Sequence, residues 1–172
     1  IAIMMPNCLQ YPVAVFGALR AGLTVVNTNP MYTARELRHQ LVDSGAVAML
    51  VLDNFGSVVQ QIIAQTQLRH VITTGLGDML GGAKGLLVNF VLKHVKKMVP
   101  DYHIAGAVRF NQALKTGSRH SLPAITLGHQ DIAFLQYTGG TTGVAKGAML
   151  SHGNMVANMQ QASAWIGTNA RL

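Results

Sequence analysis

The chain has 172 residues, of which 49% are hydrophobic and 11% are charged. Because such an apolar chain can bury enough surface to offset the entropy lost on folding, a disordered protein is excluded. Thirteen Lys and Arg residues against six Asp and Glu residues give a net charge of +7, which favours an anionic partner: a phosphorylated small molecule, an acidic lipid or a nucleic acid.

Apolar runs alternate with helical patterns along the first 75 residues. A capping-box sequence, in which a Thr and a Glu three residues later satisfy free amides at a helix start, begins at Thr33. In chain order the patterns predict a strand at 1–5, a helix at 9–20 that Gly22 ends, a strand at 23–26, a helix from 33 to before Gly45, a strand at 46–52, a helix at 57–67 and a strand at 70–74. This alternation predicts an α/β fold whose sheet is at least partly parallel.

The pattern degrades between residues 76 and 130, where we expect an irregular surface excursion with one basic helix. Residues 84–98 are amphipathic at helical spacing, with apolar residues on one face (Leu87, Val91, Val95 and Met98) and lysines on another (Lys93, Lys96 and Lys97). Such a helix either packs on the core of its own domain or lies on an anionic membrane surface. The sequence leaves both alternatives open.

Regular patterns return with a strand at 131–137, a loop at 138–147, a short strand at 148–150 and a helix at about 151–165 whose N-cap is Ser151. Residues 137–147 read Tyr-Thr-Gly-Gly-Thr-Thr-Gly-Val-Ala-Lys-Gly. Glycines let backbone amides approach a ligand, threonines add hydroxyl donors and the lysine adds a positive charge, so the loop predicts phosphate binding rather than a plain turn. A Walker A loop is excluded, because Lys146 is followed by Gly147 and not by Ser or Thr.

This loop resembles the phosphate loop of the adenylate-forming superfamily, which contains acyl-CoA synthetases, luciferases and nonribosomal adenylation domains. The superfamily pattern is an aromatic residue, Ser or Thr, a small residue and then Gly-Thr-Thr-Gly-x-Pro-Lys-Gly, from which Gly139 and Ala145 depart. With these departures, and with Ala-Met-Leu-Ser-His after the loop, the segment is similar to bacterial long-chain fatty acid:CoA ligases. Residues 6–37, 71–80 and 93–100 resemble the same enzymes, so the resemblance covers essentially the whole chain.

The resemblance implies two half-reactions. A fatty carboxylate attacks the α-phosphorus of ATP, which gives an acyl-adenylate and pyrophosphate, and the thiol of coenzyme A then displaces AMP. It also implies that the loop holds the β- and γ-phosphates, and that the bridging Mg²⁺ takes at most one hydroxyl from this chain, that of Thr138. The implied phosphate contacts are Thr138, Gly139, Gly140, Thr141, Thr142, Gly143 and Lys146.

We expect the chain to be an N-terminal fragment of one large AMP-binding domain. It begins inside a strand pattern, and the adenine and ribose sites, the hinge and the C-terminal domain of the family would lie beyond Leu172. Within it we distinguish a first α/β half (1–75), the excursion with the basic helix (76–130), and the strand, phosphate loop and helix (131–172). We expect no acyl-CoA formation by these residues alone. Two alternatives stay open: another adenylate-forming ligase with an aryl or short acyl substrate, or a non-catalytic remnant that binds a nucleotide or a membrane.

The sequence argues against several other partners. Its seven histidines contain no i, i+4 pair and Cys8 is its single cysteine, so we expect no zinc site and no internal disulfide. Aromatic residues make up 6% of the chain and are not interleaved with the basic ones, so we expect no nucleic-acid partner. Because no apolar run approaches the ~20 residues of a membrane-spanning helix, we expect a cytoplasmic protein, with peripheral attachment to the cytoplasmic face of the membrane as the open alternative. The oligomeric state cannot be read from these patterns.

Overall fold

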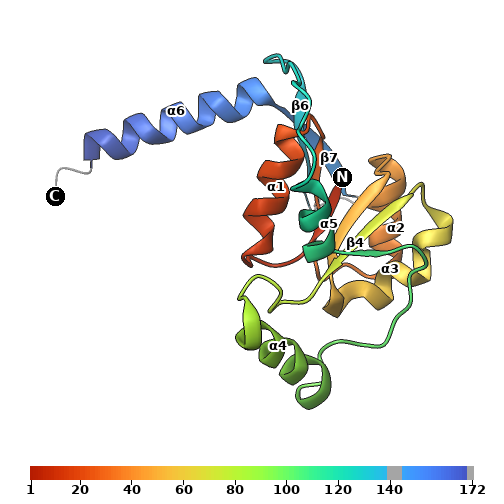
Figure 1. The fold of residues 1–172 in the computed structure, drawn as a ribbon. Helices are drawn as coiled ribbons and strands as arrows, with labels where there is room; N and C mark the ends of the chain where they lie inside the picture. Colours follow the sequence, from red (N-terminus) through yellow and green to blue (C-terminus); the bar gives the residue numbers. More distant parts are fainter. Residues whose placement is uncertain (139–144, 170–172) are drawn as a thin grey trace.

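The computed structural model describes residues 1–138 and 145–169. In these residues, seven strands form a single sheet in the order β5-β4-β3-β1-β2-β6-β7 (Figure 1). Neighbouring strands are parallel from β5 to β6, and β7 is antiparallel to β6. The bounds of the strands are β1 (Ala2–Met4), β2 (Val25–Asn27), β3 (Ala48–Leu52), β4 (His70–Thr74), β5 (Val108–Arg109), β6 (Ile132–Thr138) and β7 (Lys146–Ser151). The predicted α/β fold with a partly parallel sheet is confirmed.

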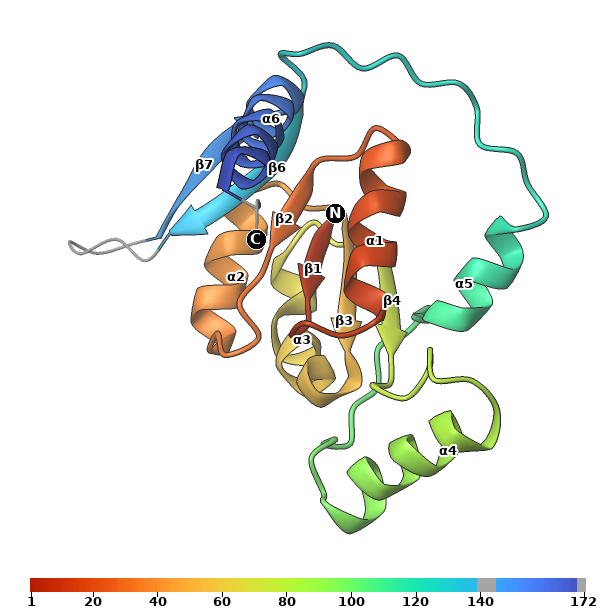
Figure 2. The same ribbon diagram turned by 90° about the vertical axis from the view of Figure 1, so that its left-hand side faces the viewer.

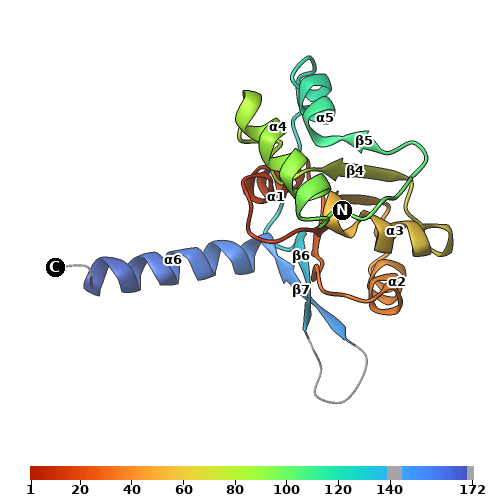
Figure 3. The same ribbon diagram turned by 90° about the horizontal axis from the view of Figure 1, so that it is seen from below.

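Helices cover both faces of the sheet. Figures 2 and 3 show α1 on one face and α2 with α3 on the other, while α4 stands apart from the sheet and α6 extends away from it. The α-helices are α1 (Gln10–Arg20), α2 (Ala34–Asp43), α3 (Gly56–Ile62), α4 (Gly82–Phe90), α5 (Phe110–Gly117) and α6 (His152–Asn169). Two 3₁₀ turns, η1 (Asp53–Phe55) and η2 (Ile63–Gln65), flank α3, and a π-helical turn, η3 (Val91–Val95), continues α4.

The core consists of two layers, one on each face of the sheet. Alternate residues of a strand point to opposite faces, and β1 shows this directly: Ala2 and Met4 belong to the layer under α2 and α3, while Ile3 belongs to the layer under α1. The first layer contains Leu37 and Leu41 of α2, both fully buried. Burial on both faces explains why these strands read as continuous apolar runs.

Three predicted helix ends are confirmed where local chemistry marks them. Helix α1 ends before Gly22, whose φ of +70° is a left-handed conformation that favours glycine. Helix α2 begins at the predicted capping box: the Thr33 N–H and hydroxyl both donate to the Glu36 carboxylate, at 2.8 and 2.7 Å, and the Glu36 N–H donates to the Thr33 hydroxyl at 3.4 Å. At the other end of the chain, the Asn154 N–H donates to the Ser151 hydroxyl at 3.2 Å, as expected of an N-cap.

The capping box makes α2 sensitive to acid. The hydrogen bonds from the hydroxyl of Thr33, and then from its N–H, lower the pKa of Glu36 below its ordinary value of 4.5. A carboxylate with a lowered pKa stabilises the fold above that ordinary value and loses this contribution as the pH falls through the pKa of the folded state. We therefore expect Glu36→Gln to be less stable than the parent at neutral pH, and the difference to shrink as the pH drops below 4.5. Urea unfolding of both proteins over this pH range measures the effect, and parallel pH profiles would contradict it.

The stretch between 76 and 130 holds more structure than the sequence patterns predicted. Strand β5 pairs in parallel with β4 at the edge of the sheet, and α5 follows it directly. A strand of two residues is too short to show a periodicity of two, which is why the patterns missed it. Helix α5 is held by Phe110, which is 5% exposed and packs in the same layer as α1.

Candidate functional site

The predicted phosphate loop connects two paired strands. Thr138 ends β6 and Lys146 begins β7, and the two residues lie directly opposite each other in the antiparallel ladder. Both side chains are exposed. The structure therefore brings these two predicted phosphate contacts together at the base of a hairpin. The other five, Gly139, Gly140, Thr141, Thr142 and Gly143, lie outside the described residues.

The loop between β6 and β7 has fewer residues than the sequence patterns predicted. Lys146 and Gly147 were expected in the loop, but they pair with Thr138 and Tyr137 and so belong to β7. Glycine in a strand often marks a place where another group comes close. A Cβ at position 147 would lie 3.0 Å from two atoms of the Tyr137 ring. Gly147 therefore leaves room for the Tyr137 ring.

A cavity lies beside the hairpin, at the carboxyl ends of the parallel strands. The chain leaves β1 toward α1 on one face of the sheet and leaves β2 toward α2 on the other, and open α/β sheets bind ligands in the crevice at such a switch point (Figure 3). The cavity has a volume of about 420 Å³. Among the described residues, the polar side chains that line it are uncharged, namely Asn7, Tyr11, Asn27, Thr28, Asn29, Tyr32, Gln136 and Tyr137.

Hydrogen bonds order part of this lining. The Tyr11 hydroxyl donates to the side-chain oxygen of Asn27 at 2.9 Å, and the Asn27 amide donates to the side-chain oxygen of Gln136 at 3.0 Å. These three residues come from α1, β2 and β6, so the contact joins the elements on either side of the crevice. The cavity thus offers uncharged donors and acceptors next to the cationic hairpin. The sequence patterns did not predict it, because its residues come from separate strands, a helix and loops that only the tertiary structure brings together.

Tyr137, the aromatic residue that precedes the loop, is 8% exposed. Its hydroxyl donates a hydrogen bond to the carboxylate of Asp43, at the end of α2. Burial raises the pKa of Tyr137 well above its ordinary value, and the hydrogen bond to Asp43 and the charge of Asp43 raise it further. The hydroxyl therefore remains protonated and stays a donor at neutral pH.

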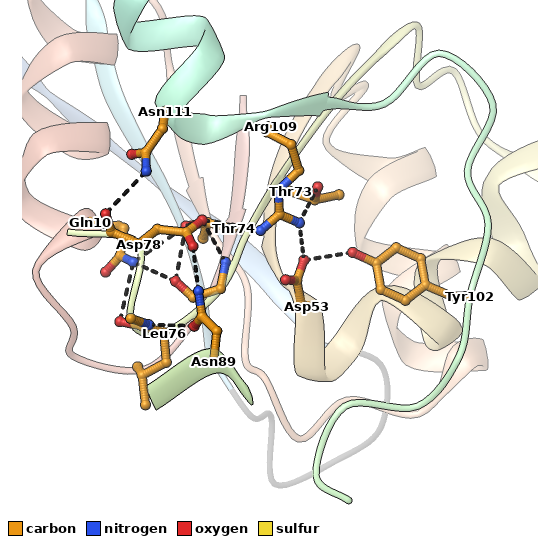
Figure 4. Close-up of polar contacts among 12 residues, drawn as sticks. Gln10, Asp53, Thr73, Thr74, Leu76, Asp78, Asn89, Tyr102, Arg109 and Asn111 are labelled. Carbon is orange, nitrogen blue, oxygen red and sulfur yellow. Dashed lines mark hydrogen bonds and ion pairs between the residues drawn. The ribbon is translucent and has the colours of Figure 1, made fainter. Parts of the chain in front are cut away.

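A second polar cluster lies at the same edge of the sheet but on the far side of β1 (Figure 4). Arg109 donates to Asp53 at 2.7 Å and to Asp78 at 3.1 Å, and the Tyr102 hydroxyl donates to Asp53 at 2.6 Å. Burial, followed by the hydrogen bond to Asp53, raises the pKa of Tyr102 to about 12. Burial lowers the pKa of Arg109, but the two carboxylates outweigh it and the pKa lies above the ordinary value.

This cluster fastens the excursion to the sheet. Asp78 accepts hydrogen bonds from the Thr74 hydroxyl, the Gly75 N–H and the Asn89 amide, which ties the end of β4 to α4. Arg109 on β5 closes the same network (Figure 4). Because Arg109 already has two carboxylate partners, we interpret the arrangement as structural. No sequence signal could have found it, since Asp53, Asp78 and Arg109 are separated by at least 25 residues of chain.

The pattern of the AMP-binding enzyme family matches residues 1–171. The long-chain-fatty-acid–CoA ligase of Escherichia coli O157:H7 is 56% identical over 167 residues, which are 97% of this chain and 30% of that protein. The ligase of the same name from Bacillus subtilis (strain 168) is 35% identical, over 96% of this chain and 30% of that protein. The chain thus spans about 30% of the length of these curated relatives.

Solved structures show the same fold. A long-chain-fatty-acid-CoA ligase from Archaeoglobus fulgidus superimposes with a TM-score of 0.69 at 25% identity, over 94% of this chain and 27% of that one. An anthranilate CoA ligase in complex with anthranoyl-AMP has a TM-score of 0.70 at 19% identity, over 92% of this chain and 26% of that one, and so supports the fold alone.

Proposed function

Since this chain belongs to the AMP-binding enzyme family, we propose that it is part of an ATP-dependent ligase that converts a long-chain fatty acid to acyl-CoA. In the first half-reaction a carboxylate oxygen of the fatty acid attacks the α-phosphorus of ATP, and pyrophosphate leaves with the bonding electron pair. In the second, the sulfur of coenzyme A attacks the acyl carbon, AMP leaves and the thiol proton is released. The bacterial relatives that are 54–56% identical carry the name long-chain-fatty-acid–CoA ligase, which supports this substrate class.

One observation carries the proposal: the Gly- and Thr-rich loop starts and ends on paired residues beside the crevice of a parallel sheet. Thr138 and Lys146 stand opposite each other with exposed side chains, so a hydroxyl donor and an ammonium group can face the same ligand. The leaving pyrophosphate gains negative charge in the transition state, and donors already in place stabilise that charge without reorganisation. We propose that the loop holds the β- and γ-phosphates of ATP.

Magnesium would enter with the nucleotide. Mg²⁺ keeps several waters and binds through one or two protein groups plus substrate phosphates. The described residues contain no cluster of His, Cys, Asp and Glu that could hold a metal ion, and Glu36, the single glutamate of the sequence, is engaged in the capping box. The exposed hydroxyl of Thr138 fits the remaining role of one weak ligand, and we assign it that role. The bound ion would neutralise part of the phosphate charge.

The same family contains ligases for other acids, and the 4-coumarate–CoA ligase 1 of Solanum tuberosum is 26% identical to this chain. The higher identity to the long-chain enzymes favours a long acyl chain over an aryl or short one. Competition among acids of different length, assayed on the complete protein, tests this choice. Preference for an aryl or a short acid would replace the substrate class but leave adenylation in place.

We expect the 172-residue chain by itself to produce no acyl-CoA. The resemblance puts the adenine and ribose sites, the hinge and the C-terminal domain of the family outside these residues, and the chain spans about 30% of the relatives' length. The measurement is thioester formation by the purified chain with ATP, Mg²⁺, palmitate and coenzyme A, beside the complete protein as a positive control. Turnover by the chain alone would contradict the expectation. A stop codon directly after Leu172 in the gene would instead favour the non-catalytic remnant.

We further propose that α4 and η3 bind an anionic membrane surface. Three residues of the predicted apolar face are exposed in the structure, Leu87 at 62%, Val95 at 63% and Met98 at 55%, so they do not pack on the described core. Exposed lysines accompany them: Lys84, Lys93, Lys96 and Lys97. None of the helices in the described residues is long and apolar enough to span a bilayer. The attachment we propose is peripheral, on the cytoplasmic face of the membrane, and would bring the ligase to the place where fatty acids partition.

Charge reversal tests the membrane proposal. We expect the variant with Lys93, Lys96 and Lys97 all changed to Glu to bind vesicles of anionic phospholipid about tenfold less tightly or worse, because each lysine near such a surface contributes on the order of 1 kcal/mol. Sedimentation of the complete protein with the vesicles measures this. The matched control changes Arg69, Lys115 and Arg119 to Glu, which alters the net charge equally at exposed positions elsewhere. Equal loss in both variants, or no loss in the first, would contradict the proposal.

A further inference from the structure

The two ends of the hairpin are anchored immediately next to the residues assigned to the phosphates. Tyr137 precedes Thr138 and is buried, and Ala145 precedes Lys146 and is half-buried. Both anchors pack against the core layer under α2. Thr138 and Lys146 themselves are exposed. The position of each ligand-facing residue is therefore set by the contacts of the residue before it.

Both anchors are contacted by polar side chains from one face of α2. Asp43 accepts the hydrogen bond of the Tyr137 hydroxyl, and the His39 ring Nε2 lies 3.4 Å from the carbonyl oxygen of Ala145. Because a carbonyl oxygen only accepts, this contact is a hydrogen bond in the tautomer that carries a hydrogen on Nε2. His39 and Asp43 are four residues apart, so they stand one above the other on the helix surface.

The contact between Tyr137 and Asp43 depends on β7, the strand that pairs with β6. Its ring lies against Gly147, where a Cβ would come within 3.0 Å of ring atoms Cε2 and Cζ. Ring and strand together direct the hydroxyl to the end of α2. The bonded residues are 94 positions apart in the sequence, and the His39 contact spans 106 positions. Such contacts connect the first half of the chain to the hairpin.

Helix α2 is itself immobilised. Leu37 and Leu41 are fully buried in the layer that also contains Tyr137. The Gln40 amide donates to the backbone oxygen of Asn27, at the end of β2, at a distance of 3.0 Å. The capping box fixes the first turn. A helix held in this way can serve as a rigid support for the residues it contacts.

We propose that His39 and Asp43 are positioning residues, which hold the two ends of the hairpin so that Thr138 and Lys146 face the phosphates of ATP. This inference rests on the proposed phosphate-binding function of the hairpin. Neither residue touches the nucleotide. Asp43 acts through Tyr137 on Thr138, and His39 acts through the carbonyl of Ala145 on Lys146.

The test is a steady-state analysis of ATP-dependent pyrophosphate release by the complete enzyme. We expect Asp43→Ala, Tyr137→Phe and His39→Ala each to raise the KM for ATP about tenfold, with the KM for the fatty acid nearly unchanged. The double variant of Asp43→Ala and Tyr137→Phe is expected to be no worse than either single one, because both remove the same hydrogen bond. Asp43→Asn keeps an acceptor oxygen and is expected to recover most of the affinity, as is His39→Gln, which keeps a donor.

Arg35→Ala is the matched control, since Arg35 is exposed on the same helix. Thermal midpoints of all variants separate positioning from folding, and Tyr137→Phe keeps the buried ring if Asp43→Ala proves unstable. The proposal is overturned if Asp43→Ala, Tyr137→Phe and His39→Ala behave like Arg35→Ala. It is equally overturned if the KM values for ATP and fatty acid rise together in step with a lower midpoint. Lys146→Ala in the same assay keeps the two proposals apart: full activity of that variant would refute phosphate binding itself.

Discussion

Lys146→Ala in the complete enzyme should lower kcat/KM for adenylation by about 10²–10³-fold, as removal of a preorganised donor to a developing negative charge does in other enzymes. The ammonium group of Lys146 is exposed, and within residues 1–138 and 145–169 it forms no hydrogen bond or ion pair. Its charge is therefore available to a ligand rather than used by the fold. Pyrophosphate exchange measured with ATP and palmitate gives the rate of the adenylation step alone.

The free energy of unfolding of Lys146→Ala should change little, although its adenylation rate falls. Replacing an exposed side chain without partners usually changes the free energy of unfolding by less than about 0.5 kcal/mol. Lys115→Ala removes an exposed lysine of α5 and should leave both quantities unchanged. Combining Lys146→Ala with Thr141→Ala and Thr142→Ala should reduce the rate further. If that triple variant adenylates at the parental rate, the phosphate-binding assignment has to be abandoned.

Leu41→Ala should cause the second large effect, a loss of about 2–5 kcal/mol in the free energy of unfolding. Leu41 is fully buried in the core layer under α2, and its truncation removes apolar contacts and leaves a cavity that the surrounding side chains fill only in part. Urea unfolding of parent and variant measures the loss.

Val42, the next residue in α2, provides the control for Leu41→Ala. Val42 is 49% exposed on the outer side of the same helix, and Val42→Ala should cost far less because little of its surface is buried. Equal losses in the two variants would show that α2 does not pack as the structure has it. Because α2 also supports the hairpin, Leu41→Ala should in addition raise the KM for ATP.

The parts of the fold that were predicted correctly depend on neighbours in the sequence. The capping box at Thr33 and the glycine at position 22 act within a few residues, and the buried strands show as apolar runs. Strand β5 and helix α5 were missed, because a strand of two residues has no periodicity to detect. Lys146 and Gly147 were placed in the loop because their pairing with β6 is decided by Tyr137 and Thr138 across the hairpin.

For the candidate site, the sequence by itself determined the chemistry: which residues carry hydroxyl, amide and ammonium donors, and in what order along the loop. Tertiary structure alone decided which elements hold these residues in place. The hairpin stands beside a crevice that the described residues line with uncharged polar groups, and α2 contacts both of its ends. Arg109 forms ion pairs with two carboxylates. These arrangements depend on the order of the strands and on the packing of the helices against them. Local patterns report backbone preferences over a few residues, whereas the contacts of Arg109 and of α2 with the hairpin join residues that are 31 to 106 positions apart, which only the packing of sheet and helices brings together.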